Sequence, residues 1–394
     1  MLRNWFRICI FGLRRLLLRE VIKMKGRIIR ALSPLAAALF LAGTAPAAQA
    51  LVININPVTG GGLTDGVFAE QALAAFNRAA SRWESAFSDN VTVEISANFL
   101  NLGDARVIGR ASSTSLIGSF DTIRNAMVAD ARNESDDAIT AALPTRAKFK
   151  TQSTNGVTFT NNIILTQANA MALGFGRVTA SDALIEFNSG FNFDFDNSDG
   201  LIGMDFESVA LHEIGHALGF ISAVDQVDYL KSRKLAGSVS VTPLDLFRFG
   251  TASNPSTVPQ FTTYKREMRP GYAAFLDDLV TEVRFSTGLN KGDGRQASHW
   301  RDDALSGVLL GVMDPTLPYD FILPLTINDF RALDLIGWEY GGDGGGGTLT
   351  GLIADTTQSS RLALVGAVPE PGTLALLCAG LIGINIFRRR KLPA

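Results

Sequence analysis

The sequence predicts an α+β fold for the central part of the chain, on three observations. Apolar residues recur at three- and four-residue steps over residues 68–87, as in a helix with one buried face. Apolar and polar residues alternate over 91–99, which is typical of a half-buried strand. Two more apolar runs with strand character, 162–165 and 183–187, precede a second helical pattern over 206–218. A helix, several strands and a further helix in this order indicate an α+β domain.

The composition allows a proper core and excludes some partners. Of 394 residues, 46% are hydrophobic, which is ample for one large domain. The formal net charge of −2 gives no long-range attraction to nucleic acid, so we expect no nucleic-acid partner. The two cysteines, Cys9 and Cys378, lie near the chain ends, which excludes a cysteine metal site or a cysteine activation switch from the body of the protein.

Residues 1–50 have the pattern of a secretory signal peptide. A basic start at Met24 is followed by an apolar run and by Ala48 and Ala50, small residues at cleavage spacing. Residues 1–23 are basic and apolar but add no second apolar core of this kind. We interpret them as a start-codon error upstream of Met24, with a genuine extended leader as the alternative.

The C-terminal end of the chain carries a second targeting signal. Residues 341–367 are a glycine-rich linker, and 368–394 contain Pro369, Glu370 and Pro371, then an apolar run, then an arginine cluster. The apolar run predicts a membrane-spanning helix with its basic flank on the cytoplasmic side.

This order of features resembles the PEP-CTERM sorting signal of Gram-negative bacteria. The resemblance implies export through the inner membrane, transient insertion of the C-terminal helix and processing by an exosortase-type enzyme. It also implies delivery to the cell surface or the extracellular matrix. An ordinary C-terminal membrane anchor is the alternative, because it uses the same helix and the same positive charges.

The stretch LHEIGHALGF, residues 211–220, contains the candidate metal-binding and catalytic residues. His212 and His216 are four residues apart, so they project from one helix face and can bind one ion at about 2 Å. Zinc lowers the pKa of a bound water to about 7, and Glu213 can take its proton and pass it to a leaving amine. Gly219 stands where a left-handed helix cap favours glycine. A chance HExxH pattern on an ordinary helix is the alternative.

A hydrolytic zinc site needs a third protein ligand. The chain has three histidines, so the one remaining candidate imidazole is His299. Ser222 and Asp225 are nearer in sequence; a serine hydroxyl is a poor zinc ligand, and Asp225 is the alternative to His299. A histidine on a surface loop is the other interpretation of His299.

The extended pattern HExxHxxG resembles the metzincin zinc peptidases, although these place histidine or aspartate where this chain has Ser222. The leishmanolysin-like branch instead inserts a long segment and supplies the third histidine when the chain returns. Here His299 is followed by Met313 in the turn-forming sequence GVMDP, in the same order.

The resemblance implies a zincin-like (metzincin) catalytic domain over 51–340, with a mixed sheet, an active-site helix and a C-terminal helix. The segment 221–297 is the insert between the second and third ligands. His212, His216 and His299 are then the zinc ligands, Glu213 is the base and Met313 lies in the turn beneath them. Simple core packing is the alternative for Met313.

Four smaller expectations concern the surroundings of the site. The pattern Thr326 to Asp329 is a variant capping box that starts the C-terminal helix. The loop Asp194–Gly200 is a candidate for binding Ca²⁺, but its glycine is misplaced for an EF-hand, so a plain polar turn is the alternative. Tyr319 is a candidate for stabilising an oxyanion. The resemblance also assigns DALIEFN, 182–188, as the edge strand that pairs with an extended protein or peptide substrate.

These observations predict an exported zinc-dependent endopeptidase. One alternative is a surface or biofilm-matrix protein that keeps a zincin fold for binding without turnover, although the intact Glu213 argues against it. Another is a zinc-dependent esterase or deacetylase that acts on surface polysaccharide.

Overall fold

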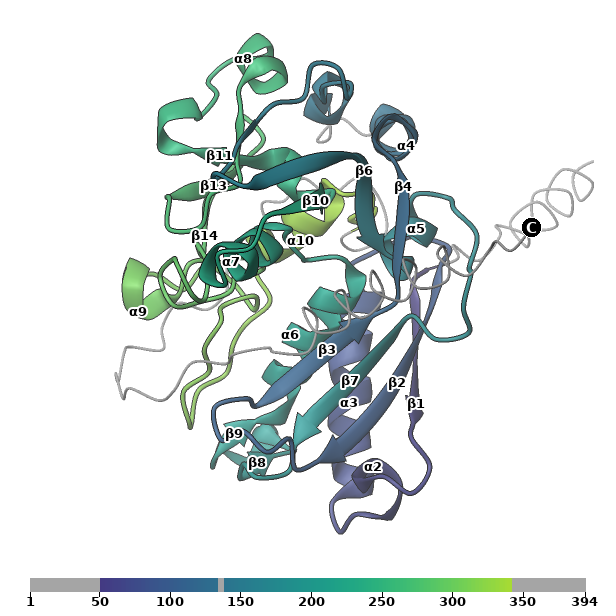
Figure 1. The fold of residues 1–394 in the computed structure, drawn as a ribbon. Coiled ribbons are helices and arrows are strands. Elements are labelled where there is room, and N and C mark those ends of the chain that lie inside the picture. The colour runs from purple at the N-terminus through teal and green to yellow at the C-terminus, as the bar shows by residue number, and fades with distance from the viewer. Residues whose placement is uncertain (1–49, 134–137, 342–394) are drawn as a thin grey trace, which may run out of the picture. The chain divides into compact units, whose positions relative to one another are not determined.

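The computed structural model describes residues 50–133 and 138–341 (Figure 1). The predicted signal peptide, linker and sorting signal lie outside the described residues. Within those residues, no helix has both the length and the apolar character that a membrane crossing needs. Helices and several mixed sheets make up the described part, which confirms the predicted α+β class.

A four-stranded mixed sheet supports the histidine helix. Its order is β1 (Val52–Pro57), β2 (Thr92–Leu100), β7 (Ala183–Asn188) and β3 (Gly109–Ser113). The first three strands are parallel, and β3 is antiparallel to β7. Buried residues alternate along β2, as its sequence pattern predicts.

The expectation that 182–188 forms the edge strand is wrong. β7 lies between β2 and β3, and β3 is the last strand of the sheet. Alternation of apolar residues reports which face of a strand is buried, but not how many neighbours the strand has. The short strand β3, rich in glycine and serine, gave no sequence signal of its own.

Two helices lie together on one face of this sheet (Figure 1). They are α3 (Ala69–Glu84) and α6 (Phe206–Leu218), both close to the predicted bounds. Trp83 of α3 is fully buried, and its indole N–H donates to the carbonyl of Leu211 in α6 at 3.1 Å. The helices are therefore joined by a polar bond within an apolar interface, which fixes the register between them. A short helix, α2 (Gly62–Asp65), precedes α3.

A three-stranded sheet and a two-stranded one flank this core. The first has the order β10 (Gly237–Val241), β6 (Val157–Thr166) and β4 (Ser115–Ser119). The predicted strand 162–165 is thus the end of a longer strand, β6. The second pairs β8 (Phe193–Asp194) with β9 (Met204–Asp205). Helix α4 (Phe120–Asp130) follows β4, and α5 (Gln167–Ala172) follows β6.

The segment 221–297, which carried no readable pattern, folds into helices and a sheet. The sheet has the order β14 (Glu282–Phe285), β13 (Ala274–Asp277), β11 (Arg248–Gly250) and β12 (Arg266–Glu267), and β5 (Thr151–Gln152), from outside the segment, completes it. The helices of the segment are α7 (Val224–Ser232) and α8 (Val258–Thr263).

Buried arginines fill part of this region. Arg266 is fully buried with its guanidinium 4.2 Å from the ring centre of Phe249, and it donates to three main-chain carbonyls. Burial lowers its pKa to about 9. Charged residues of this kind break the apolar periodicity on which sequence interpretation relies.

The chain closes with α9 (Asp303–Ser306) and α10 (Ile327–Asp334). The capping box predicted at Thr326 and Asp329 is confirmed. Asp329 also reaches beyond its own helix: its carboxylate accepts the N–H of Val312 at 2.9 Å and the indole N–H of Trp300 at 2.8 Å. One fully buried carboxylate therefore ties α10 to two separate loops.

We predict that Asp329→Ala lowers the free energy of unfolding by roughly 2–4 kcal/mol, because it leaves several buried donors without an acceptor. Urea denaturation measures this change. The exposed Asp199 provides a matched control, since Asp199→Ala should change stability by less than about 0.5 kcal/mol. Equal effects of the two substitutions would contradict the role assigned to Asp329.

Candidate metal centre

Helix α6 is anchored at both ends, so its side chains have fixed positions. Asp205 caps its first turn by accepting the N–H of Ser208 at 2.9 Å. Gly219 ends the helix with a φ of +124°, which confirms the predicted left-handed cap. The N–H of Phe220 then donates to the carbonyl of Gly215 at 3.0 Å, and the chain turns away sharply. Every residue of α6 is buried.

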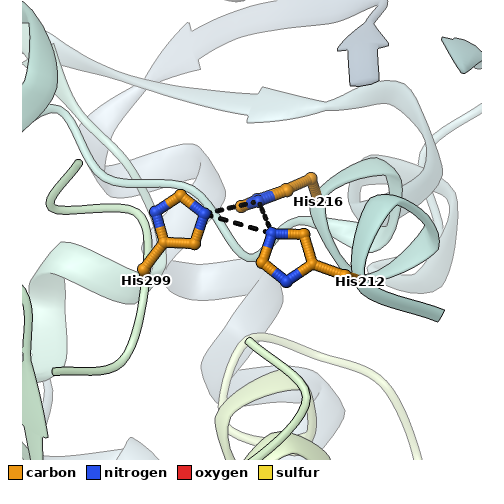
Figure 2. Close-up of side chains that lie close together, drawn as sticks. All are labelled: His212, His216 and His299. Atoms are coloured by element: carbon orange, nitrogen blue, oxygen red, sulfur yellow. Dashed lines mark hydrogen bonds between the residues drawn. The ribbon is translucent and has the colours of Figure 1, made fainter. Parts of the chain in front are cut away.

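Three histidines converge on one point beside this helix (Figure 2). The Nε2 atom of His212 lies 3.1 Å from that of His216 and 3.1 Å from that of His299, and the third side of the triangle measures 3.3 Å. His299 is fully buried, so it is not a histidine on a surface loop. The structure brings together the three histidines that the sequence singled out.

The far side of each ring contacts a main-chain carbonyl. Nδ1 of His212 lies 2.8 Å from the oxygen of Val312, that of His216 lies 2.8 Å from Phe220 and that of His299 lies 3.2 Å from Gln296. A carbonyl can only accept, so each Nδ1 carries a proton. In a neutral ring, the form that binds a metal, each Nε2 then keeps a lone pair that points toward the other two.

Lone pairs at this separation repel unless a cation lies between them. Four-coordinate zinc with Zn–N bonds of about 2.0–2.1 Å separates its ligand atoms by about 3.3 Å, which matches the observed triangle. Three neutral imidazoles also form a donor set that zinc accepts, and backbone contacts at Nδ1 are the usual support of histidine ligands. The arrangement fits a divalent zinc ion.

Glu213 lies next to this cluster and faces β3. Its side chain is fully buried, and a Cβ placed on Gly109 of β3 would lie 2.7 Å from its Oε1. Only a glycine at this position lets the strand approach the carboxylate so closely. A cavity opens beside Glu213, lined by Ile108, Ser208, Val209, His212, Glu213, Asp314, Thr316, Leu317 and Leu323.

The turn predicted beneath the ligands is present. The N–H of Asp314 donates to the carbonyl of Gly311 at 3.2 Å, and Met313 is fully buried. A Cβ on Gly215 of α6 would overlap the sulfur of Met313, so the helix and the turn pack at the closest approach that glycine allows. Because Val312 in this turn holds the ring of His212, the turn supports the first histidine directly.

The alternative third ligands have other contacts. Both carboxylate oxygens of Asp225 accept main-chain N–H groups, at 2.6 Å from Ala297 and 3.0 Å from Ser298. The hydroxyl of Ser222 donates to Asp245 at 2.7 Å. Neither residue belongs to the group that the three histidines form.

Two weaker candidates have simpler surroundings. In the loop Asp194–Gly200, Asp194 accepts the N–H groups of Asp196 and Ile202 at 2.9 and 2.8 Å, as in a polar turn. The groups of described residues able to hold a metal do not include this loop. Tyr319 is 40% exposed and stands outside the lining of the cavity beside Glu213.

A second group of residues that could hold a metal ion, all of them aspartates, lies near the cavity and was not predicted from the sequence. Asp302, Asp303 and Asp314 come within 4.8 Å of one another. Burial, and next the charge of Asp303, raises the pKa of Asp314 to about 7. Asp302 and Asp303 are adjacent in the sequence, but no pattern there indicates that Asp314, eleven residues later, joins them.

Comparison with known proteins identifies one segment of the chain. A family model described as the PEP-CTERM protein-sorting motif matches residues 367–391. No curated protein and no solved structure matches the chain. The match confirms the predicted sorting motif around Pro369, Glu370 and Pro371. It marks an exported protein of a Gram-negative bacterium and implies processing by an exosortase-type enzyme.

The raised pKa of Asp314 predicts a pH dependence of stability. Its folded-state pKa of about 7 exceeds the value of about 3.9 expected in an unfolded chain. The folded state therefore binds the proton more tightly, so this contribution to stability is complete below about pH 4 and is lost as the pH rises through about 7.

We predict that Asp314→Asn removes this contribution. Between pH 4 and pH 8, the unfolding free energy of the wild type should fall by roughly 2–4 kcal/mol more than that of the variant. Urea denaturation with a chelator present at both pH values separates this effect from metal binding. Parallel pH profiles for the two proteins would show that Asp314 titrates normally in the folded state.

Proposed function

We propose that this protein is an exported zinc-dependent endopeptidase with a zincin-like catalytic domain. The observation that carries the proposal is the triangle of three imidazole Nε2 atoms with the carboxylate of Glu213 beside it. The buried helix α6, the turn at Met313 and the closing helix α10 support the same assignment.

His212, His216 and His299 would hold the metal. A zinc ion bound there supplies a Lewis acid that polarises a peptide carbonyl and lowers the pKa of water. The chain's own contribution is a rigid donor set, because main-chain carbonyls orient all three rings. Little reorganisation is then needed when substrate binds.

Glu213 acts as the general base. It follows His212 on α6, and both residues line the same cavity, so its carboxylate can reach a water near the histidine nitrogens. It accepts a proton as the water oxygen attacks the carbonyl carbon. It then returns that proton to the departing amine as the C–N bond breaks, so the proton count balances.

The substrate is an extended protein or peptide segment that lies along β3. This strand is the last in the sheet order and pairs with β7 alone among the described strands. It also lies directly against Glu213 through Gly109. Main-chain pairing with an edge strand positions a scissile carbonyl with little demand on side-chain sequence.

The sorting motif indicates where in the cell this activity would take place. An exported protein with a PEP-CTERM motif would act at the cell surface or in the extracellular matrix. A peptidase there meets proteins rather than nucleic acid, consistent with a net charge of −2.

We predict that Glu213→Ala lowers casein hydrolysis at least about 100-fold while the protein retains its zinc, because a base is lost and no ligand is. The full chain in mild detergent serves for the assay, with zinc measured by elemental analysis on the same samples. Glu70→Ala, which removes an exposed carboxylate from α3, is the control and should leave both values unchanged.

The wild type and His299→Ala test the metal centre itself. The wild type should contain one zinc per chain, and the variant should lose most of the metal and all activity. Zinc without hydrolysis of casein would favour the binding-protein alternative. Turnover of acetylated glycans alone would favour the esterase or deacetylase, and a wild type without zinc would reject the proposal.

A further inference from the structure

The position of His299 raises a structural question. His299 lies 83 residues after His216, yet their Nε2 atoms are 3.3 Å apart. Between them the chain leaves α6, forms α7 and the strands β10–β14, and returns to the metal centre. A returning loop can serve as a rigid ligand only if its main chain is held by something else.

Helix α7, at the start of the insert, holds that loop. Asp225 in its first turn accepts the N–H of Ala297 at 2.6 Å and the N–H of Ser298 at 3.0 Å. The hydroxyl of Ser298 also donates to the same carboxylate. Two consecutive peptide groups immediately before His299 are thus fixed by one buried side chain.

The carbonyl side of the same loop is held from β11. Arg248 donates from Nη1 to the carbonyl of Ala297 at 3.2 Å and from Nη2 to that of Ser286 at 2.7 Å. Its guanidinium is fully buried and lies 4.6 Å from the ring centre of Phe285. The positive charge of Arg248 also offsets the buried charge of Asp225 through Coulomb attraction.

The residues after the ligand are held as well. The N–H of Ser286 donates to the carbonyl of His299 at 3.0 Å, and its hydroxyl donates to the carbonyl of Trp300 at 2.7 Å. Arg295 and Asp302 then close the base of the loop with a bond of 2.5 Å. The main chain on both sides of His299 is therefore fixed.

We propose that Asp225 is a positioning residue for the third metal ligand, and that the insert serves to deliver and fix His299. This inference rests on the proposed function. Asparagine at position 225 has one acceptor oxygen in place of the two that hold Ala297 and Ser298, so the loop gains freedom and the ring of His299 leaves its position more often.

The same helix provides a matched control. Asp228 lies one turn after Asp225 and also accepts main-chain N–H groups, from Asn290 and Lys291, each at 2.7 Å. It holds the returning chain well before His299. Asp228→Asn removes the same charge from the same helix without touching the peptides next to the ligand.

The test is the zinc dissociation constant of the full chain in detergent, measured by competition with a chelating dye. We expect Asp225→Asn to weaken zinc binding about 10–100-fold, the usual effect of losing a residue that supports a ligand. Asp228→Asn should leave the zinc dissociation constant of the wild type unchanged. The visible absorption of bound Co²⁺, strong in four-coordinate and weak in six-coordinate sites, should fall for Asp225→Asn alone.

The outcomes separate this inference from the proposed function. If His299→Ala loses zinc while Asp225→Asn and Asp228→Asn bind it equally, with one Co²⁺ spectrum, the positioning role is overturned and the metal centre stands. If the wild type binds no zinc, both fail.

A milder variant serves if Asp225→Asn does not fold. Ser298→Ala removes the hydroxyl bond to Asp225, together with the bond that the N–H of Ser222 donates to the same hydroxyl, and keeps both main-chain bonds to Asp225. It should weaken zinc binding about threefold, a small share of the effect that loss of a whole supporting residue produces. Binding equal to that of the wild type would overturn the positioning role.

Discussion

The structure depends on one electrostatic constraint: main-chain carbonyls orient three imidazole rings so that their Nε2 atoms meet within 3.3 Å. Such a cluster is unfavourable in isolation and becomes favourable around a cation. The carbonyls belong to the end of α6, the turn at Met313 and the loop before His299. Each of these segments must be fixed before the rings can converge.

Buried aspartates fix these segments. Asp205 caps the helix that carries His212 and His216, Asp225 holds the loop of His299, and Asp329 holds the turn at Met313. Burying a carboxylate is costly unless N–H groups surround it, and these three aspartates each accept main-chain N–H groups. These aspartates therefore define the positions of the segments that orient the histidine rings, at some cost to the stability of the folded protein. The same interaction, a buried carboxylate that accepts main-chain N–H groups, therefore occurs at Asp205, Asp225 and Asp329.

The sequence predicted the parts of this arrangement that depend on local chemistry. The spacing of His212 and His216, the cap at Gly219 and the capping box at Thr326 follow from neighbours along one helix, and the structure has them within a residue or two. Counting histidines led to His299, which the structure brings to the other two. The sequence could not reveal which strand forms the sheet edge, since that depends on pairing between distant segments. For the same reason the sequence places Asp225 among the candidate ligands, whereas in the structure it accepts the N–H groups of Ala297 and Ser298 beside His299.

Zinc K-edge X-ray absorption on the full chain tests the central claim most directly. The account predicts a first shell at about 2.0–2.1 Å with outer-shell scattering from three imidazole rings. A shell with two imidazoles and a carboxylate would contradict the assignment of His299, and a first shell with no imidazole scattering would contradict the metal centre itself.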